Sequence, residues 1–209
     1  ATSIRVTLGV EPQEQRRARD PAALFSLLRT AAEAAGIFVL LLGDLGSHHS
    51  DLGEEVFRGF ALADDIAPFV VINDNDATAA RSFTLLHELA HIWVGASGVS
   101  GPLRGKPDNA IERLCNEIAG IFLLPSAVLA DIADGGKVDF DQALGVTDEI
   151  ARTWNVSQGV VTYRLLVDGQ ITSEVATQLF QVFADRWRAQ RQVTTANREP
   201  GERGPNFDV

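Results

Sequence analysis

The chain has few residues that could fix it covalently or anchor it in a membrane: one cysteine, no methionine and no long apolar run. A single cysteine, Cys115, excludes an internal disulfide and agrees with a reducing compartment. No stretch approaches the roughly eighteen apolar residues of a transmembrane helix. A signal peptide is not expected, because the first residues are charged. Without methionine, Ala1 is either a processed start or a cut from a longer protein. We therefore expect a cytoplasmic protein.

Basic residues are also scarce. The 209 residues include 18 Lys and Arg against 28 Asp and Glu, a net charge of −10. This balance argues against nucleic-acid binding by the chain as a whole, because phosphate contacts need clustered basic side chains. A basic protein partner remains compatible with it. The length suits one well-buried domain, which we place at 1–190, with about 20 N-terminal residues as a linker and 191–209 as a polar, disordered tail.

The most informative feature is the motif H-E-x-x-H within an apolar stretch. On a helix, His87 and His91 lie four residues apart and share a face, so both imidazoles can bind one Zn²⁺. Glu88 then lies beside the position where water binds and can take a proton from it. The motif therefore predicts the hydrolytic centre of a zincin metallopeptidase. Mn²⁺ or Fe²⁺ also suits two histidines and a carboxylate.

A third protein ligand is needed, and it is expected from a second helix at 108–125. Asp108 or Asn109 can cap this helix, and Pro125 ends it. The apolar residues of this segment predict its buried face: Ile111, Leu114, Cys115, Ile118, Phe122 and Pro125. Glu112 and Asn116 border that face, which makes Glu112 the expected ligand and Asn116 an amide that orients a ligand histidine. Glu117 is the fallback ligand.

These two segments resemble a known family. Residues 83–91, Phe-Thr-Leu-Leu-His-Glu-Leu-Ala-His, are similar to the F-T-L-A-H-E-L-G-H signature of the ImmA/IrrE metallopeptidases. Residues 112–125 look like the family's E-x-x-A-N…L-M-P segment, whose first residue, the zinc glutamate, corresponds to Glu112. Residues 150–165 form a weaker third match. Family members act on, or alongside, helix-turn-helix repressors of the xenobiotic-response-element (XRE) type. The resemblance thus implies a zinc endopeptidase that cleaves or inactivates such a repressor in stress response, mobile-element or toxin–antitoxin control.

The hydrophobic pattern predicts an α+β fold, in which a small, mostly antiparallel sheet packs on the H-E-x-x-H helix and the C-terminal half is helical. Strands are expected at 37–42, 56–62 and 69–72, the last two as a hairpin, and helices at 21–35, 77–94, 126–133, 139–153, 157–167 and 172–191. Residues 1–20 read as extended or loose, and 95–107 as a mobile connector. If strand 69–72 is a sheet edge, an extended substrate could add to it.

Two other functions stay open at this stage. The chain could be a non-catalytic metal-binding interaction module, or a DNA-binding regulator that uses the helix-turn-helix-like segment 147–170. That segment offers few basic side chains, so we favour a packing role for it. Tyr163, His48 and His49 are candidates for oxyanion or substrate contacts, and the sequence does not choose between them.

Overall fold

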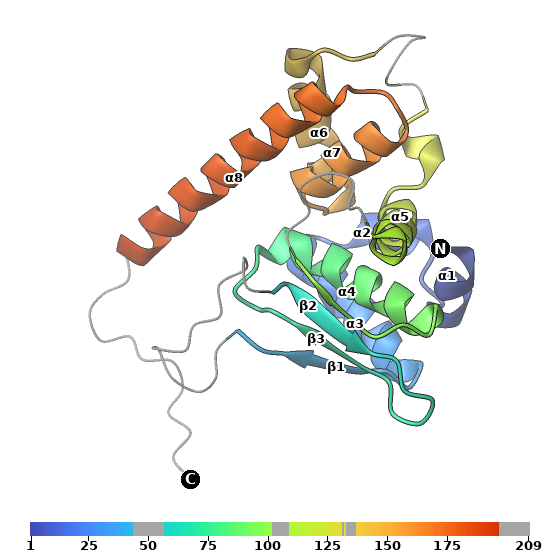
Figure 1. The fold of residues 1–209 in the computed structure, drawn as a ribbon. Helices are drawn as coiled ribbons and strands as arrows, with labels where there is room; N and C mark the ends of the chain where they lie inside the picture. Colours follow the sequence, from blue (N-terminus) through green and yellow to red (C-terminus); the bar gives the residue numbers. More distant parts are fainter. Residues whose placement is uncertain (44–56, 102–108, 131, 133–136, 197–209) are drawn as a thin grey trace.

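The computed structural model describes residues 1–43, 57–101, 109–130, 132 and 137–196, with side chains up to residue 190. The elements are α1 (Thr2–Leu8), α2 (Pro12–Arg17), α3 (Pro21–Ala34), β1 (Phe38–Leu41), β2 (Gly59–Leu62), β3 (Phe69–Ile72), α4 (Thr78–Trp93), β4 (Gly98–Ser100), α5 (Ala110–Leu123), the 3-10 turn η1 (Ser126–Val128), α6 (Phe140–Trp154), α7 (Gln158–Val167) and α8 (Ser173–Ala196). Figure 1 shows the sheet and the helices around it.

The sheet has the strand order β1-β3-β2-β4. β1 pairs with β3 in parallel, whereas the β2–β3 and β2–β4 pairs are antiparallel. The hairpin between β2 and β3 turns at Asp64, whose carboxylate accepts hydrogen bonds from the backbone N–H groups of Ile66 and Ala67. The predicted α+β fold, the mostly antiparallel sheet and the hairpin are confirmed.

The structure decides one open point about the sheet and corrects one expectation. β3 is an inner strand between β1 and β2, so residues 69–72 are not a sheet edge. The connector after α4 contains β4, which pairs with β2 through Val99 and Phe60. A three-residue strand is too short for its alternation to show in the sequence.

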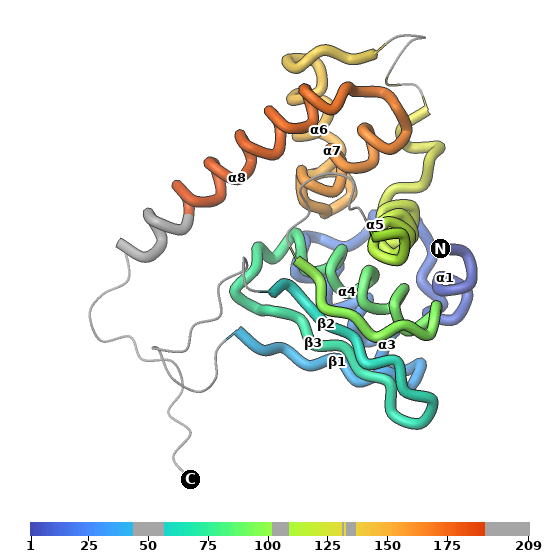
Figure 2. Tube along the Cα trace, viewed as in Figure 1, coloured from blue at the N-terminus to red at the C-terminus, as the bar shows by residue number. Residues whose placement is uncertain are grey.

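Helices cover one face of the sheet. α3 packs on β1, and α4 packs on β2 and β3 (Figure 2). Side chains alternate between the two faces of a strand, so Val39, Ala61 and Val70 are buried beneath the helices. The opposite face carries aromatic side chains, among them Phe60 and Phe69. Their rings contact edge to face, with 5.9 Å between the ring centroids.

The C-terminal half is helical, as predicted. α6 and α7 meet at Asn155, which adopts a left-handed conformation with φ 56°. The side chains of α7 point into the protein: Tyr163 is 2% exposed and Arg164 is 1% exposed. This burial favours the packing role of segment 147–170, because a DNA reader must present these side chains to solvent. Only a 3-10 turn is described where helix 126–133 was expected. None of the described helices has both the length and the apolar character that crossing a bilayer requires.

The expectation that residues 1–20 are loose is also wrong, since they form α1 and α2. Ile4 is buried at 2% exposure in the main core. Arg5 donates to the carbonyl oxygen of Phe122, and the Gln15 amide donates to that of Leu123 at 2.7 Å. These two carbonyls lie at the C-terminal end of α5 and have no acceptor role within the helix, so the N-terminal helices cap α5.

A matched pair of substitutions in α1 tests whether this segment is part of the folded unit. Ile4→Ala removes a buried side chain and should lower the free energy of unfolding by about 2–5 kcal/mol. Val6→Ala changes a side chain that is 76% exposed in the same helix and should be close to neutral. Chemical denaturation measures both. Equal, small effects would mean that α1 contributes no core.

Candidate metal centre

The H-E-x-x-H motif lies in α4, which is buried on all sides over this part of its length. Every residue from Ser82 to His91 is buried, because β2, β3 and β4 cover one side of the helix while α3 and α5 cover others. His87 and His91 therefore project from the same side of a helix that has little access to water, with 3% and 1% of their surfaces exposed.

α5 brings a carboxylate to the two histidines. The Nε2 atoms of His87 and His91 are 3.1 Å apart. The two carboxylate oxygens of Glu112 lie 3.2 Å from His87 Nε2 and 3.1 Å from His91 Nε2. The three side chains are the one His/Cys/Asp/Glu group of this kind among the described residues.

The spacing of these donors suits a metal. Ligand atoms about 2.0–2.2 Å from a tetrahedral zinc ion are roughly 3.3 Å from one another, close to the three separations observed here. His91 Nδ1 lies 3.0 Å from the carbonyl oxygen of Ala96, which favours a proton on Nδ1 and leaves Nε2 free to bind. Two histidines and one carboxylate with an open fourth position form the donor set of catalytic zinc sites.

The protonation states also suit metal binding. Hydrogen bonding to His87 is the main reason that the pKa of Glu112 lies below its usual value. Burial and the neighbouring His87 charge lower the pKa of His91. An ionised carboxylate and a neutral imidazole are the forms that bind a cation, so few protons have to leave before the metal enters.

Glu88 contacts the sheet, where it lies against β2 and β4. Its side chain is fully buried, and the Ser100 hydroxyl of β4 donates a hydrogen bond to Oε1. Ser100 Oγ also lies 3.2 Å from the Gly59 carbonyl oxygen of β2. Glu88 Oε2 is buried and has no hydrogen-bond partner among the described residues. Burial raises the pKa of Glu88 to about 7, and the opposing effects of the His87 charge and the Ser100 hydrogen bond are smaller.

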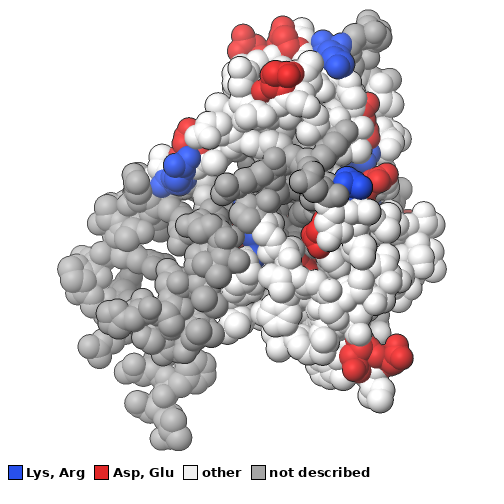
Figure 3. All heavy atoms as spheres, in the orientation of Figure 1, with Lys and Arg blue, Asp and Glu red and all other residues white. Residues whose placement is uncertain are grey.

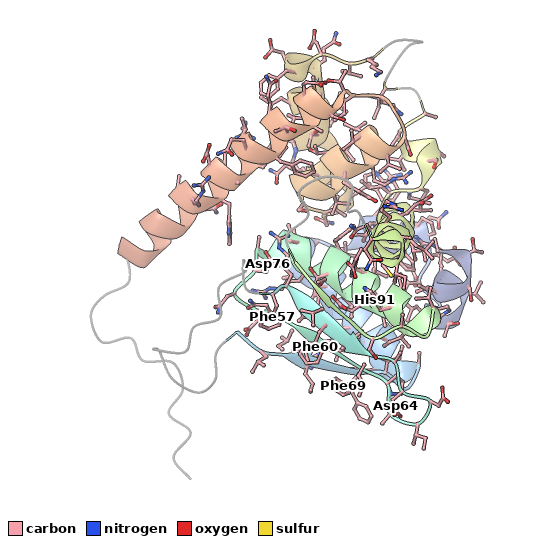
Figure 4. All side chains as sticks on the ribbon, viewed as in Figure 1. Phe57, Phe60, Asp64, Phe69, Asp76 and His91 are labelled. Atoms are coloured by element: carbon pink, nitrogen blue, oxygen red, sulfur yellow. The ribbon has the colours of Figure 1, made fainter. Side chains whose placement is uncertain are left out.

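Two glycines let the sheet approach these side chains. A Cβ atom added at Gly59 would lie 2.9 Å from Glu88 Oε1 and 2.8 Å from Thr84 Cγ2. A Cβ atom at Gly98 would lie 2.7 Å from Cε1 of His91. Contacts this short do not occur, so any larger residue at either position would displace a side chain of the site. His91 in Figure 4 lies on α4 beside the strands.

Sequence analysis missed Ser100, Gly59 and Gly98 as site residues. Ser100 and Gly98 belong to the unpredicted strand β4, and Gly59 lies in a strand that was predicted without its contacts. A glycine–valine–serine triplet in a glycine-rich segment gives no local signal of this role. It is the pairing of β4 with β2 that places them on α4.

The other predicted site residues fall in different places. Glu117 is exposed, and Glu112 is the carboxylate that lies against the histidines. Asn116 is 8% exposed on the same side of α5, but no hydrogen bond joins it to either histidine within the described residues, so its orienting role stays a prediction. Tyr163 contacts the ring of Phe83, and Phe83 in turn contacts the ring of His87. His48 and His49 lie outside the described residues.

Cys115 is a core residue as predicted, whereas the predicted buried face of α5 needs a correction. Cys115 is buried, and its burial raises the pKa of its thiol to about 12, as expected for an inert core cysteine. However, Ile111 and Leu114 are 43% and 45% exposed, so they do not belong to the buried face. The buried face is rotated relative to the prediction: it includes the polar residue Asn116, and Glu112 is partly buried beside it.

A buried H-E-x-x-H helix joined by a carboxylate from the next helix defines a metallopeptidase-type centre. Comparison with protein families agrees: residues 32–166 match peptidase family M78, described as the IrrE N-terminal-like domain. The match covers more than half of the chain and includes both α4 and α5, so the chain belongs to this family. Comparison with curated proteins and with solved structures gives no match.

The ligand assignment is tested by metal content. Glu112→Ala should lower metal affinity by more than the ~10–100-fold that loss of an outer-shell partner costs. Glu117→Ala, an exposed carboxylate in the same helix, should bind metal like the wild type. Chelation should lower the melting temperature of the wild type, because the metal ties α4 to α5. Metal loss in the Glu117 variant instead would overturn the assignment.

The metal-free protein should also show the burial of Glu88 in its pH-dependent stability. Folding raises the pKa of Glu88 from 4.5 to about 7, so folding disfavours the ionised form. The resulting destabilisation is absent below about pH 4.5 and complete above about pH 7, where it amounts to about 3 kcal/mol. Glu88→Gln removes this titration. The melting temperature of chelated Glu88→Gln, relative to chelated wild type, should therefore rise between about pH 5 and about pH 8. A difference that stays constant with pH would contradict the buried carboxyl.

Proposed function

We propose that the protein is a zinc-dependent endopeptidase that cleaves or inactivates a helix-turn-helix transcriptional repressor. The observation that supports peptidase activity is that His87, His91 and Glu112 lie within hydrogen-bonding distance of one another. The buried carboxyl group of Glu88 follows His87 directly in the sequence. Membership of a peptidase family supports it. Zinc is the expected ion, and Mn²⁺ or Fe²⁺ suits the same donors.

The roles of the side chains follow from their positions. His87, His91 and Glu112 would hold the ion, which when bound lowers the pKa of water and polarises a carbonyl group. Ser100 holds Oε1 of Glu88, so Oε2 is the atom left to accept a proton and later to return it to the leaving amine. A pKa near 7 suits a general base at neutral pH, and a nearby cation favours its ionised form.

The substrate segment is expected to be extended. β4 is an edge strand, and its residues Gly98 and Ser100 contact His91 and Glu88. A segment that adds to β4 as a further strand would therefore lie along the candidate metal ligands. β4 thus takes the place of strand 69–72 as the candidate edge for the substrate, because strand 69–72 is an inner strand of the sheet. Strand addition needs a substrate segment that is flexible or locally unfolded.

The charge of the chain supports a DNA-binding protein as the substrate. A net charge of −10 would speed encounter with a basic DNA-binding domain, and salt would weaken this effect. Figure 3 shows acidic side chains at separate places on the visible face, including the far end of the hairpin. The family resemblance adds the XRE-type repressor as the partner, and such a repressor acts in the cytoplasm. This assignment would place the protein in stress response, mobile-element or toxin–antitoxin control.

The test is incubation with the XRE-type repressor encoded beside its gene, with and without chelator, followed by mass spectrometry of the products. The wild type should cut the repressor at one or a few sites. Glu88→Gln keeps the shape of the side chain but cannot act as a base, so it should retain metal and lose turnover by at least ~100-fold. Chelation should have the same effect on the wild type.

Other outcomes would separate the competing functions. Full activity in Glu88→Gln would contradict Glu88 as the base. Metal binding without cleavage of any cognate partner would favour a non-catalytic module. Equal cleavage of casein and of the repressor would indicate a general peptidase rather than a regulatory one.

A further inference from the structure

At the edge of the sheet remote from the candidate metal centre, the described residues leave a strand unprotected. β1 forms this edge and pairs only with β3 among the described strands (Figure 1). Its sequence, Phe-Val-Leu-Leu, has no charged residue and no proline. Natural sheets usually protect an edge with lysine, proline or a bulge, because a bare apolar edge pairs with other strands. β1 contains neither lysine nor proline.

In β1, two residues direct their backbone N–H and C=O groups away from the sheet. Phe38 N–H donates to the Pro68 carbonyl oxygen, and Leu42 N–H donates to that of Ile72. In a parallel pair, alternate residues bond the same neighbour, so the N–H and C=O groups of residues 39 and 41 point away from β3. The free edge therefore offers two donors and two acceptors in one row.

The side chains around this row form a groove. A groove of about 430 Å³ is lined by residues 36–40 together with Arg29 and Glu33 of α3. Arg29 and Glu33 are paired at 2.8 Å and are partly exposed, with 37% and 44% of their side chains accessible. On the outer face, Phe38 is 61% exposed and Leu40 is 53% exposed. The edge thus combines open backbone groups, apolar side chains and one pair of opposite charges.

We propose that this edge binds a second copy of the chain through antiparallel pairing of the two β1 strands about a two-fold axis at Leu40. In that register Val39 of each copy faces Leu41 of the other, and each such pair exchanges two hydrogen bonds. All four outward N–H groups are then satisfied. The two Leu40 side chains lie opposite each other at the axis, and the two sheets become one continuous sheet.

The charges beside the edge are self-complementary, which favours a second copy over an unrelated peptide. Under a two-fold axis every contact between two different residues occurs twice, so Arg29 of one copy can pair with Glu33 of the other, and the reverse. An unrelated peptide would need one acidic and one basic side chain at matching positions to pair with Arg29 and Glu33. The pairing also leaves β4 open, because β1 and β4 are the two opposite edges of the sheet. A four-residue strand with its flanking side chains forms a small interface, so the dimer should depend on concentration in the micromolar range, on the order of 1–100 μM.

Sedimentation of the full chain over a concentration series tests the proposal. Leu40→Lys places two like charges against each other at the axis and removes the apolar contact between the two leucines, so it should weaken dimerisation by at least ~10-fold. Val99→Lys is the matched control, because Val99 is 69% exposed on the same face of the sheet but lies in β4. It should dimerise like the wild type. A wild type that remains monomeric into the millimolar range would overturn the proposal, as would equal effects of the two substitutions.

A charge swap tests the contact between the two copies of α3. Arg29→Glu and Glu33→Arg should each weaken dimerisation, and the double variant should restore it. Failure of the double variant to recover would exclude this orientation. Circular dichroism verifies that each variant is folded.

Hydrogen exchange locates the interface. The N–H groups of Val39 and Leu41 should exchange rapidly in the monomer and become protected in the dimer, whereas Leu42 N–H, which bonds to β3, should be protected in both. A dimer in which residues 39 and 41 remain unprotected has its interface elsewhere. Protection of these two amides by an extended repressor peptide in a monomeric protein would instead identify the edge as a peptide site, and would also overturn the proposal.

Discussion

The candidate site depends on the burial of α4. A helix that carries two histidines and a glutamate into the core leaves ionisable groups without water, and such groups are costly unless each finds a partner. The neighbouring elements supply these partners. α5 contributes Glu112 to the histidines, and β4 contributes Ser100 to Glu88. Glu88 Oε2 is left without a hydrogen-bond partner among the described residues, and it is the atom to which the proposed function assigns the role of base.

The burial of α4 also requires a close approach of the sheet to this helix. The strands must approach α4 closely enough to exclude water from Glu88 and His91, and glycine is the residue that permits such an approach at Gly59 and Gly98. Glycine weakens a strand, and these strands have only three or four residues. A sheet this small gains stability by packing on helices: α4 supports β2 and β4, whose close approach encloses the site, and α3 supports β1.

The elements that could be predicted are those whose pattern lies within their own short stretch of sequence. The H-E-x-x-H helix, the hairpin and the helices at α6 and α7 each carry their own periodicity or turn residues. β4 could not be predicted, because its three residues become a strand only through β2, about forty residues earlier. The N-terminal helices were missed because few of their residues are apolar, although Ile4 and Leu8 are buried four positions apart. The predicted buried face of α5 was wrong at the candidate ligand: Glu112 lies against the two histidines, whereas the apolar residue Ile111 is exposed.

The position of Glu112 is fixed from several distant parts of the chain. α5 begins at the cap Asn109, so Glu112 lies in its first turn. About 16 Å further along the helix, at its other end, Arg5 and Gln15 donate hydrogen bonds to the last carbonyl groups. Between them, Gly120 allows the buried Arg164 of α7 to pack against α5. A third ligand that differs from the histidines in its helix must be held by the tertiary structure. The N-terminal segment and α7 thus contribute to the candidate metal centre without contacting it, since a rotation or shift of α5 would carry the carboxylate away from His87 and His91.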